Sequence, residues 1–329
     1  MAIARNVLVV CDASRGHLTA SARELLTLAR SLADALAGNV DLLALGAAAP
    51  NIVADAGAAG ADQVCAADGA DRQGYHPEAF AAITLRACEA ATPRIVLFAH
   101  DALGLDLAPR VAFGIGARWA TNCIGIAVEG DALRCERTEV GGKLQVVEVI
   151  DGQAVATLRP KSIDARAPQS RRDARVLAVP AAPPQAAEGV VFVERRMEDG
   201  GAAEELEQAA IVVTGGLGMG SPGAFAKLRE LAEALGASLA GSKQAVDRGW
   251  IPANRQVGLT GTTVAPKVYV AVAVSGALQH MAGCQKSRTI VAINSDPAAP
   301  IFRFARYGIV AKWEEVLPEL LAQLSAARA

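Results

Sequence analysis

Short apolar runs alternate with longer amphipathic stretches in the N-terminal part of the chain. Leu25, Leu28 and Leu32 recur on one face of a helix, and the stretch Ser21 to Glu24 has the form of a capping box, which predicts where that helix begins. Strands and helices that alternate in this way predict a doubly wound parallel sheet. The other predicted elements are strands at Asn6–Cys11, Val40–Leu45, Gln63–Ala66 and Ile95–Ala99, and a helix at Pro77–Ala91.

The pattern changes near Thr121, where short strands are separated by glycine-containing turns. Such breaks are typical of antiparallel ribbons, which we expect to be appended to the first sheet. A segment rich in Pro, Ala and Arg follows, with one strand at Arg175–Val179, and we place a domain boundary near residue 200. The predicted domains are therefore residues 1–200 and 201–329. The predicted ribbon strands are Cys123–Val128, Ala132–Thr138, Leu144–Val149 and Ala154–Arg159.

Alternation of strand and helix resumes after the boundary. A strand at Ile211–Thr214 leads into the glycine-rich run 215–220, and Ser221-Pro222 then favours the start of a helix. Further strands are predicted at Val268–Val274 and Thr289–Ile293, and a closing amphipathic helix at 313–324. This order predicts a C-terminal α/β domain of flavodoxin or Rossmann type.

Composition narrows the class of protein. The chain has 329 residues, of which 52% are hydrophobic but only 4% aromatic, so the core must consist of small aliphatic side chains, as in parallel sheets. A net charge of −2 and a pI near 6.1 argue against a nucleic-acid partner and against an anionic membrane surface.

The six cysteines show no CxxC spacing, which favours reduced, buried thiols and predicts no metal site. The first residues lead directly into a predicted strand, so we expect no secretory leader, and we find no apolar run of transmembrane length. We therefore expect a bacterial cytoplasmic protein that does not insert into a membrane.

Two turns rich in glycine and hydroxyl residues carry the strongest chemical signal. They are Val257–Gly261 and Val274–His280, and the second follows an apolar strand and begins a helix. Such turns present free backbone N–H groups and a positive dipole end, which suit a pyrophosphate. The run Gly215–Gly220 does not match the dinucleotide fingerprint, so a tight turn explains it equally well.

Four side chains beside these turns each allow two interpretations. Ser242 suits the N-cap position of a helix, or contacts a ligand. Lys243 is either an exposed, solvated side chain or lies near an anionic group, because a helix N-terminus disfavours a cation. His280 lies on the candidate anion-binding turn, although a single His is more often a packing residue. Asn294 ends a strand where α/β sheets bind ligands, or simply forms a turn.

These segments, in this order, resemble the α subunit of electron-transfer flavoprotein, the FixB-like family. The resemblance covers essentially the whole chain and is most specific over 211–310. It rests on the motifs Val213–Gly218, Ala245–Trp250, Gln256–Gly261, Ser275–His280, Val291–Pro297 and Ala299–Phe302, and more weakly on Leu107–Val111 and Ala154–Pro160.

The resemblance implies an electron carrier rather than an enzyme with its own substrate. Family α subunits bind FAD in the C-terminal domain and form a heterodimer with a β subunit, which usually holds AMP. Electrons arrive from flavoprotein dehydrogenases and leave to an acceptor such as a quinone oxidoreductase. Carried over to this chain, the resemblance places the cofactor against Leu217, Gly218, Ser242, Lys243, Gln256, Val257, Gly258, Leu259, Thr260, Ser275, Gly276, Ala277, Leu278, Gln279, His280, Asn294 and Arg306.

The chain departs from the family pattern at several of these positions. Leu217 and Lys243 each stand where the family usually has Arg, Leu259 stands where it has Gln, and Arg306 replaces an Asp. These departures predict a divergent member with an altered flavin potential. They also leave open a cofactor-poor scaffold subunit. A further alternative is an FAD-dependent oxidoreductase with its own substrate, for which the sequence offers no convincing acid/base residue.

Overall fold

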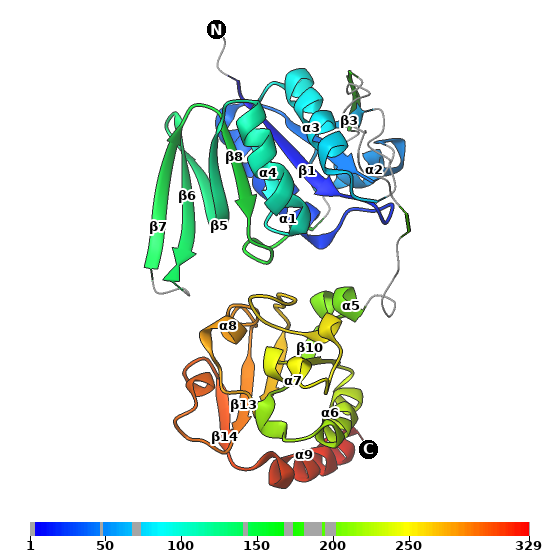
Figure 1. The fold of residues 1–329 in the computed structure, drawn as a ribbon, viewed down its shortest axis with the longest axis vertical. Coiled ribbons are helices and arrows are strands. Elements are labelled where there is room, and N and C mark those ends of the chain that lie inside the picture. The colour runs from blue at the N-terminus through cyan, green and yellow to red at the C-terminus, as the bar shows by residue number, and fades with distance from the viewer. Residues whose placement is uncertain are drawn as a thin grey trace. The chain divides into compact units, whose positions relative to one another are not determined.

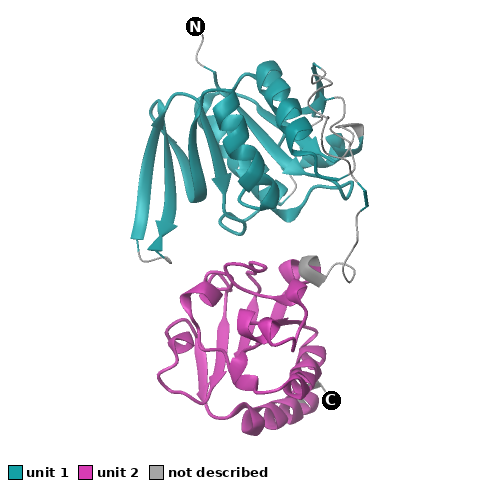
Figure 2. Cartoon of the chain, in the orientation of Figure 1, with its two compact units in different colours: residues 1–196 teal, residues 197–329 magenta. Residues whose placement is uncertain are grey.

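The computed structural model describes residues 4–46, 49–67, 74–140, 144–167, 174–180, 193–194 and 202–328. The chain divides into two compact units, residues 1–196 and 197–329 (Figure 2). The boundary predicted near residue 200 lies outside the described residues.

The first unit is built on a nine-stranded sheet in the order β7-β6-β5-β8-β4-β1-β2-β3-β9 (Figure 1). Helices α1 and α2 share one apolar core with one face of the sheet, and α3 and α4 share a second core with the other face. This is the doubly wound arrangement that the sequence predicts. The elements are β1 (Asn6–Asp12), α1 (Ala20–Leu36), β2 (Val40–Leu45), α2 (Ala49–Ala59), β3 (Gln63–Ala67), α3 (Pro77–Ala91), β4 (Pro93–Ala99), α4 (Ala102–Gly114) and β9 (Arg175–Val179).

An antiparallel ribbon of β5 (Arg118–Glu129), β6 (Ala132–Glu139) and β7 (Leu144–Asp151) extends the sheet at one edge, as predicted. The prediction of a fourth ribbon strand is wrong. β8 (Ala154–Leu158) runs parallel to β4 and β5 and lies between them. All of its residues are buried, which is the signature of a central parallel strand, so the uninterrupted apolar run was a better guide than the neighbouring turn.

The capping box predicted at Ser21 is also wrong. α1 begins at Ala20, and the hydroxyl of Thr19 accepts the backbone N–H of Ala22 at 3.1 Å, so Ser21 lies inside the first turn. The buried Glu24 carboxylate accepts instead from the backbone N–H of Lys161 at 2.8 Å. Glu24 thus attaches the helix to the segment that follows β8.

The second unit contains a parallel five-stranded sheet in the order β11-β10-β12-β13-β14. On one face, α6 and α9 form an apolar core with Val213, Val270 and Ile293. The opposite face is covered by short helices and loops. The elements are α5 (Ala202–Gln208), β10 (Ile211–Gly215), η3 (Leu217–Met219), α6 (Pro222–Leu235), β11 (Ser238–Gly241), α7 (Lys243–Asp247), η4 (Ala253–Arg255), β12 (Val268–Val272), α8 (Leu278–Met281), β13 (Ile290–Asn294), η5 (Pro300–Arg303), β14 (Tyr307–Val310) and α9 (Trp313–Arg328).

Two local predictions for this unit have different outcomes. Ser221 caps α6 through its hydroxyl, and Pro222 occupies the first turn, as predicted. β12 ends at Val272, two residues before the predicted end, because Ala273 adopts a left-handed φ of 53° that stops the strand. None of the described helices in either unit combines the length and apolar character needed to cross a membrane.

Candidate cofactor-binding site

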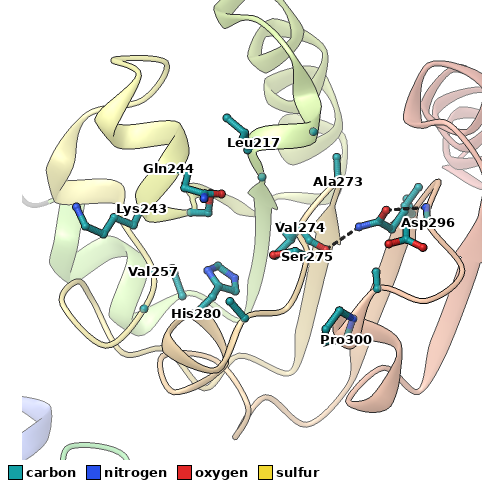
Figure 3. Close-up of a pocket in the computed structure, with 18 of the residues that line it drawn as sticks. Leu217, Lys243, Gln244, Val257, Ala273, Val274, Ser275, His280, Asp296 and Pro300 are labelled. Carbon is teal, nitrogen blue, oxygen red and sulfur yellow. Dashed lines mark hydrogen bonds between the residues drawn. The ribbon is translucent and has the colours of Figure 1, made fainter. Parts of the chain in front are cut away.

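A cavity of about 820 Å³ opens at the carboxyl ends of the strands in the second unit (Figure 3). The chain passes from β10 outward to β11 and then back across to β12, so the strand order reverses between β10 and β12. Open α/β sheets bind ligands at such a reversal, and this volume is within the range of small-molecule sites.

Most of the residues predicted from the sequence line this cavity. The exceptions are Gly276, Leu278 and Arg306, of which Arg306 is exposed with its guanidinium 5.9 Å from the centroid of the Tyr307 ring. The predicted residues that do line it are Leu217, Gly218, Ser242, Lys243, Gln256, Val257, Gly258, Leu259, Thr260, Ser275, Ala277, Gln279, His280 and Asn294.

The glycine-rich turn after β10 packs directly on the end of β12. The backbone N–H of Gly216 donates to the carbonyl oxygen of Val272 at 2.9 Å. A Cβ at Gly216 would lie 2.1 Å from the carbonyl oxygen of Ala273. The glycine is therefore required for backbone contact, in agreement with the tight-turn interpretation.

The turn after β12 lines the cavity through Ser275 and Ala277 and carries free amides. The Ser275 carbonyl accepts from the backbone N–H of Ile301 at 3.0 Å, and Gly276 has a φ of +80°. Within the described residues, the N–H groups of Ser275, Gly276 and Ala277 donate to no other group. Three adjacent free donors suit an anionic group of a ligand.

The 256–260 loop is hydrogen-bonded to Gln279, in the segment that follows β12. The N–H of Leu259 donates to the Gln279 carbonyl at 2.7 Å, and the buried Gln256 side chain donates to the Thr260 hydroxyl at 3.0 Å. Leu259 itself is 64% exposed, so its apolar side chain lies at the rim.

Ser242 and Lys243 lie at the start of α7. The Ser242 hydroxyl accepts the N–H of Ala245, so its capping role is present. Nζ of Lys243 pairs with Asp247 at 2.9 Å, one turn along the same helix, and Figure 3 shows the side chain extending away from Ser275 and His280. An internal carboxylate therefore compensates this exposed cation.

His280 is a buried neutral imidazole rather than a cation. Its Nε2 lies 2.9 Å from the Tyr269 hydroxyl, whereas Nδ1 is buried without a hydrogen-bond partner among the described residues. Burial lowers the pKa of His280 to about 4, and the Val257 backbone opposes this only partly. The ring is uncharged at neutral pH.

The side-chain amide of Asn294 forms hydrogen bonds at the ends of two strands. Its Nδ2 donates to the Val274 carbonyl at 2.9 Å, and its Oδ1 accepts from the Asp296 N–H at 2.9 Å. Both ends of the amide are engaged, so the structure assigns this residue the turn-forming role.

Sequence reasoning missed several lining residues. Gln244, Asp296, Pro300 and the segment 311–314 all border the cavity. The segment 311–314 follows β14, an exposed edge strand that the apolar pattern did not reveal. Recognising that strand would have placed these residues at the shared carboxyl edge. Among the described residues, no cluster of three or more His, Cys, Asp or Glu side chains could hold a metal ion.

Comparison with known proteins identifies two matching family models. The electron transfer flavoprotein domain matches residues 7–184, and the electron transfer flavoprotein FAD-binding domain matches residues 205–285. The chain is 34% identical over 325 residues to the electron transfer flavoprotein subunit alpha of Thermoanaerobacterium thermosaccharolyticum, covering 97% of this chain and 98% of the relative. It is 35% identical over 324 residues to protein FixB of Clostridium saccharobutylicum, covering 97% and 96%.

Proposed function

Because the chain belongs to the electron transfer flavoprotein α-subunit family, we propose that it relays electrons between proteins through FAD held in the cavity of its second unit. The FAD-binding domain model of this family matches residues 205–285, which lie in the second unit. FAD supplies the redox chemistry when bound, through its isoalloxazine ring. The chain's own residues then bind the cofactor, orient it and tune its environment.

The residues of the cavity fit such a dinucleotide in chemical terms. The cavity lies where the strand order reverses, the Ser275–Ala277 turn offers unpaired N–H donors, and Nδ1 of His280 is a buried polar atom without a partner. The position of the cavity carries the most weight, because open α/β sheets bind ligands at the carboxyl ends of their strands where the strand order reverses.

We propose a division of roles among the lining residues. The amides of Ser275 and Ala277 hold a phosphate group, the 256–260 loop and the 216–218 turn enclose the cofactor, and His280 contacts its ring system. Gly276, Leu278 and Arg306 are left out of the proposed contacts because they do not line the cavity.

The proposed partners follow from the family. We propose a heterodimer with a β subunit that holds AMP, with dehydrogenase flavoproteins as electron donors and a quinone oxidoreductase as acceptor. The proposed location is the bacterial cytoplasm, which agrees with six buried cysteines that are all free thiols.

Charge around the cavity favours a low flavin potential. Leu217 and Leu259 are apolar, Lys243 is paired with Asp247, and the other lining cation, Lys312, shares the lining with the carboxylates Asp296 and Glu314. Few free positive charges are then available to stabilise the negative charge that a flavin gains on reduction.

The test is to co-express the chain with its β subunit, isolate the complex by gel filtration and record a visible spectrum. We expect flavin bands that bleach when a reduced donor dehydrogenase is added and return with a quinone oxidoreductase. A stable heterodimer that stays colourless when FAD is supplied would support the scaffold function instead. Bleaching by a small substrate without any dehydrogenase would indicate an oxidoreductase.

A further inference from the structure

Two buried cysteines lie on neighbouring strands of the antiparallel ribbon in the first unit. Cys123 of β5 is 0% exposed and Cys135 of β6 is 1% exposed. In the ladder, Cys123 is opposite Arg137, and Cys135 is two residues before Arg137 on the same strand. Residues opposite each other or two apart on paired strands point to the same face, so both thiols enter the same apolar core.

The two thiols are also in contact with each other. The register shifts between Cys123 and Gly125, where β5 has one more residue than the facing part of β6. A hydrogen bond joins the two side chains, in which the Cys135 thiol donates and the Cys123 sulfur accepts. This bond lowers the pKa of Cys123 and raises the pKa of Cys135. Both cysteines are free thiols in this structure, so the pair is in its reduced state.

Positive charge near the pair acts mainly on Cys123. After the bond from Cys135, the Arg137 and Arg159 guanidinium groups lower the pKa of Cys123 further, against burial and the Glu148 carboxylate. Arg159 is held in place by both strands, because its Nε donates to Asn122 of β5 at 2.9 Å and its Nη2 donates to the Thr138 hydroxyl of β6 at 3.1 Å. Cys123 is therefore the more readily ionised thiol of the two, and a thiolate is the form that attacks a disulfide.

We propose that Cys123 and Cys135 are a thiol redox site that forms a reversible disulfide by exchange with a small-molecule disulfide. The site lies in the first unit and does not depend on the cofactor proposed for the second.

The exchange has two steps, here written with glutathione disulfide. The Cys123 sulfur attacks one sulfur of glutathione disulfide, and the glutathione thiolate that leaves takes up the Cys123 proton. The Cys135 sulfur then attacks the Cys123 sulfur, and the second glutathione leaves with the Cys135 proton. Two protein thiols and one glutathione disulfide become one protein disulfide and two glutathione thiols, so two electrons pass from the protein to glutathione disulfide.

Because both sulfurs are shielded from solvent, the exchange requires the ribbon to open. The ribbon forms one edge of the nine-stranded sheet, and its outermost strand, β7, leaves Val147 and Val149 about half exposed. Such edges open locally at a lower free energy than global unfolding. Opening therefore limits the rate of exchange, whereas the equilibrium between dithiol and disulfide depends only on the two closed states.

An equilibrium redox titration of the full chain tests the proposal. The protein is incubated in buffers of increasing glutathione disulfide content, its remaining thiols are blocked with N-ethylmaleimide under denaturing conditions, and its peptides are mapped by mass spectrometry. We expect the number of blocked thiols to fall by two from the initial six, with Cys123 linked to Cys135, and to return to six in reduced glutathione. Six thiols at every ratio, a mixed disulfide as the end product, or a link between other cysteines would overturn the proposal.

Two variants assign the roles of the thiols. Cys135→Ala lacks the second thiol, so the exchange should stop at a mixed disulfide between Cys123 and glutathione. Cys284→Ala is the matched control, because Cys284 is equally buried but lies in the second unit, and it should still lose two thiols. A link that includes Cys284, seen as retention of all remaining thiols in the control, would contradict the assignment. If Cys135→Ala fails to fold, the peptide map of the wild type still decides whether the disulfide forms.

Discussion

At the scale of single residues, polar side chains around the cavity serve the fold before they serve a ligand. Asn294 uses both ends of its amide to join the ends of β12 and β13, and Lys243 is paired with a carboxylate of its own helix. His280 differs from both, because one of its two polar atoms has no partner among the described residues. Residue type alone therefore does not identify a ligand contact.

Asn294→Asp tests the structural role of the two hydrogen bonds that the Asn294 amide makes. The new carboxylate still accepts from the Asp296 N–H, but it can no longer donate to the Val274 carbonyl and places two acceptors against each other. We expect the free energy of unfolding to fall by about 1–3 kcal/mol, measured by urea unfolding of the full chain. Asn6→Asp is a comparison at another strand-end asparagine, whose Nδ2 donates to Ala91. An Asn294→Asp variant as stable as the wild type would contradict the assigned role.

At the scale of elements, close backbone approach constrains the turn that follows β12. Gly276 combines a φ of +80° with a position where a Cβ would lie 2.3 Å from the Ile301 nitrogen. Gly220 has nearly the same φ, +82°, but its Cβ would meet nothing within 4 Å. The two glycines therefore separate backbone strain from close packing.

Gly276→Ala and Gly220→Ala form a matched pair. Both variants place an alanine at a left-handed φ, which lowers the free energy of unfolding by about 1 kcal/mol. Gly276→Ala must also displace η5, so its total loss should be roughly 3 kcal/mol. Thermal unfolding of the two full-length variants measures the difference. Equal losses would show that the contact between the turn and Ile301 does not constrain the backbone.

The sequence predicts element types better than their partners. The apolar pattern predicts the core strands. The turn beside β8 can be recognised from neighbouring residues and wrongly places this strand in the ribbon. Its pairing with β4 joins segments that are distant in the sequence, so no local pattern reveals it. Thr19 rather than Ser21 caps α1, a difference of two residues that cap chemistry alone does not resolve. The turn after β12 was predictable because it follows an apolar strand, whereas 311–314 was missed together with β14.

At the scale of the whole molecule, each unit contains one buried titratable group. The two groups change the stability of their units in opposite directions as pH rises. His280 binds a proton in the unfolded chain below about pH 6.5 but only near pH 4 when folded, so the second unit gains stability as pH rises through that window. Asp41 behaves in the opposite way. Burial, with Asp62 nearby, raises its pKa to about 7, so the folded first unit retains a proton that the unfolded chain releases above pH 3.8.

Asp41→Asn should therefore stabilise the first unit at pH 8. The native carboxylate is buried with no hydrogen-bond partner among the described residues, and its ionisation costs up to about 4 kcal/mol between pH 4 and 8. We expect the variant to lose most of this pH dependence in urea unfolding. Asp34→Asn, at a side chain that is 63% exposed, is the control and should change little. A variant with the wild-type pH profile would show that Asp41 is not the titrating group.

Hydrogen exchange of the full chain in complex with its β subunit, with and without FAD, tests the central claim most directly. The account predicts that FAD slows amide exchange in the 216–218 turn, the 256–260 loop and the 275–280 turn of the second unit, while the amides of α1 to α4 exchange as before. Protection that avoids these three segments would contradict the placement of the cofactor in this cavity.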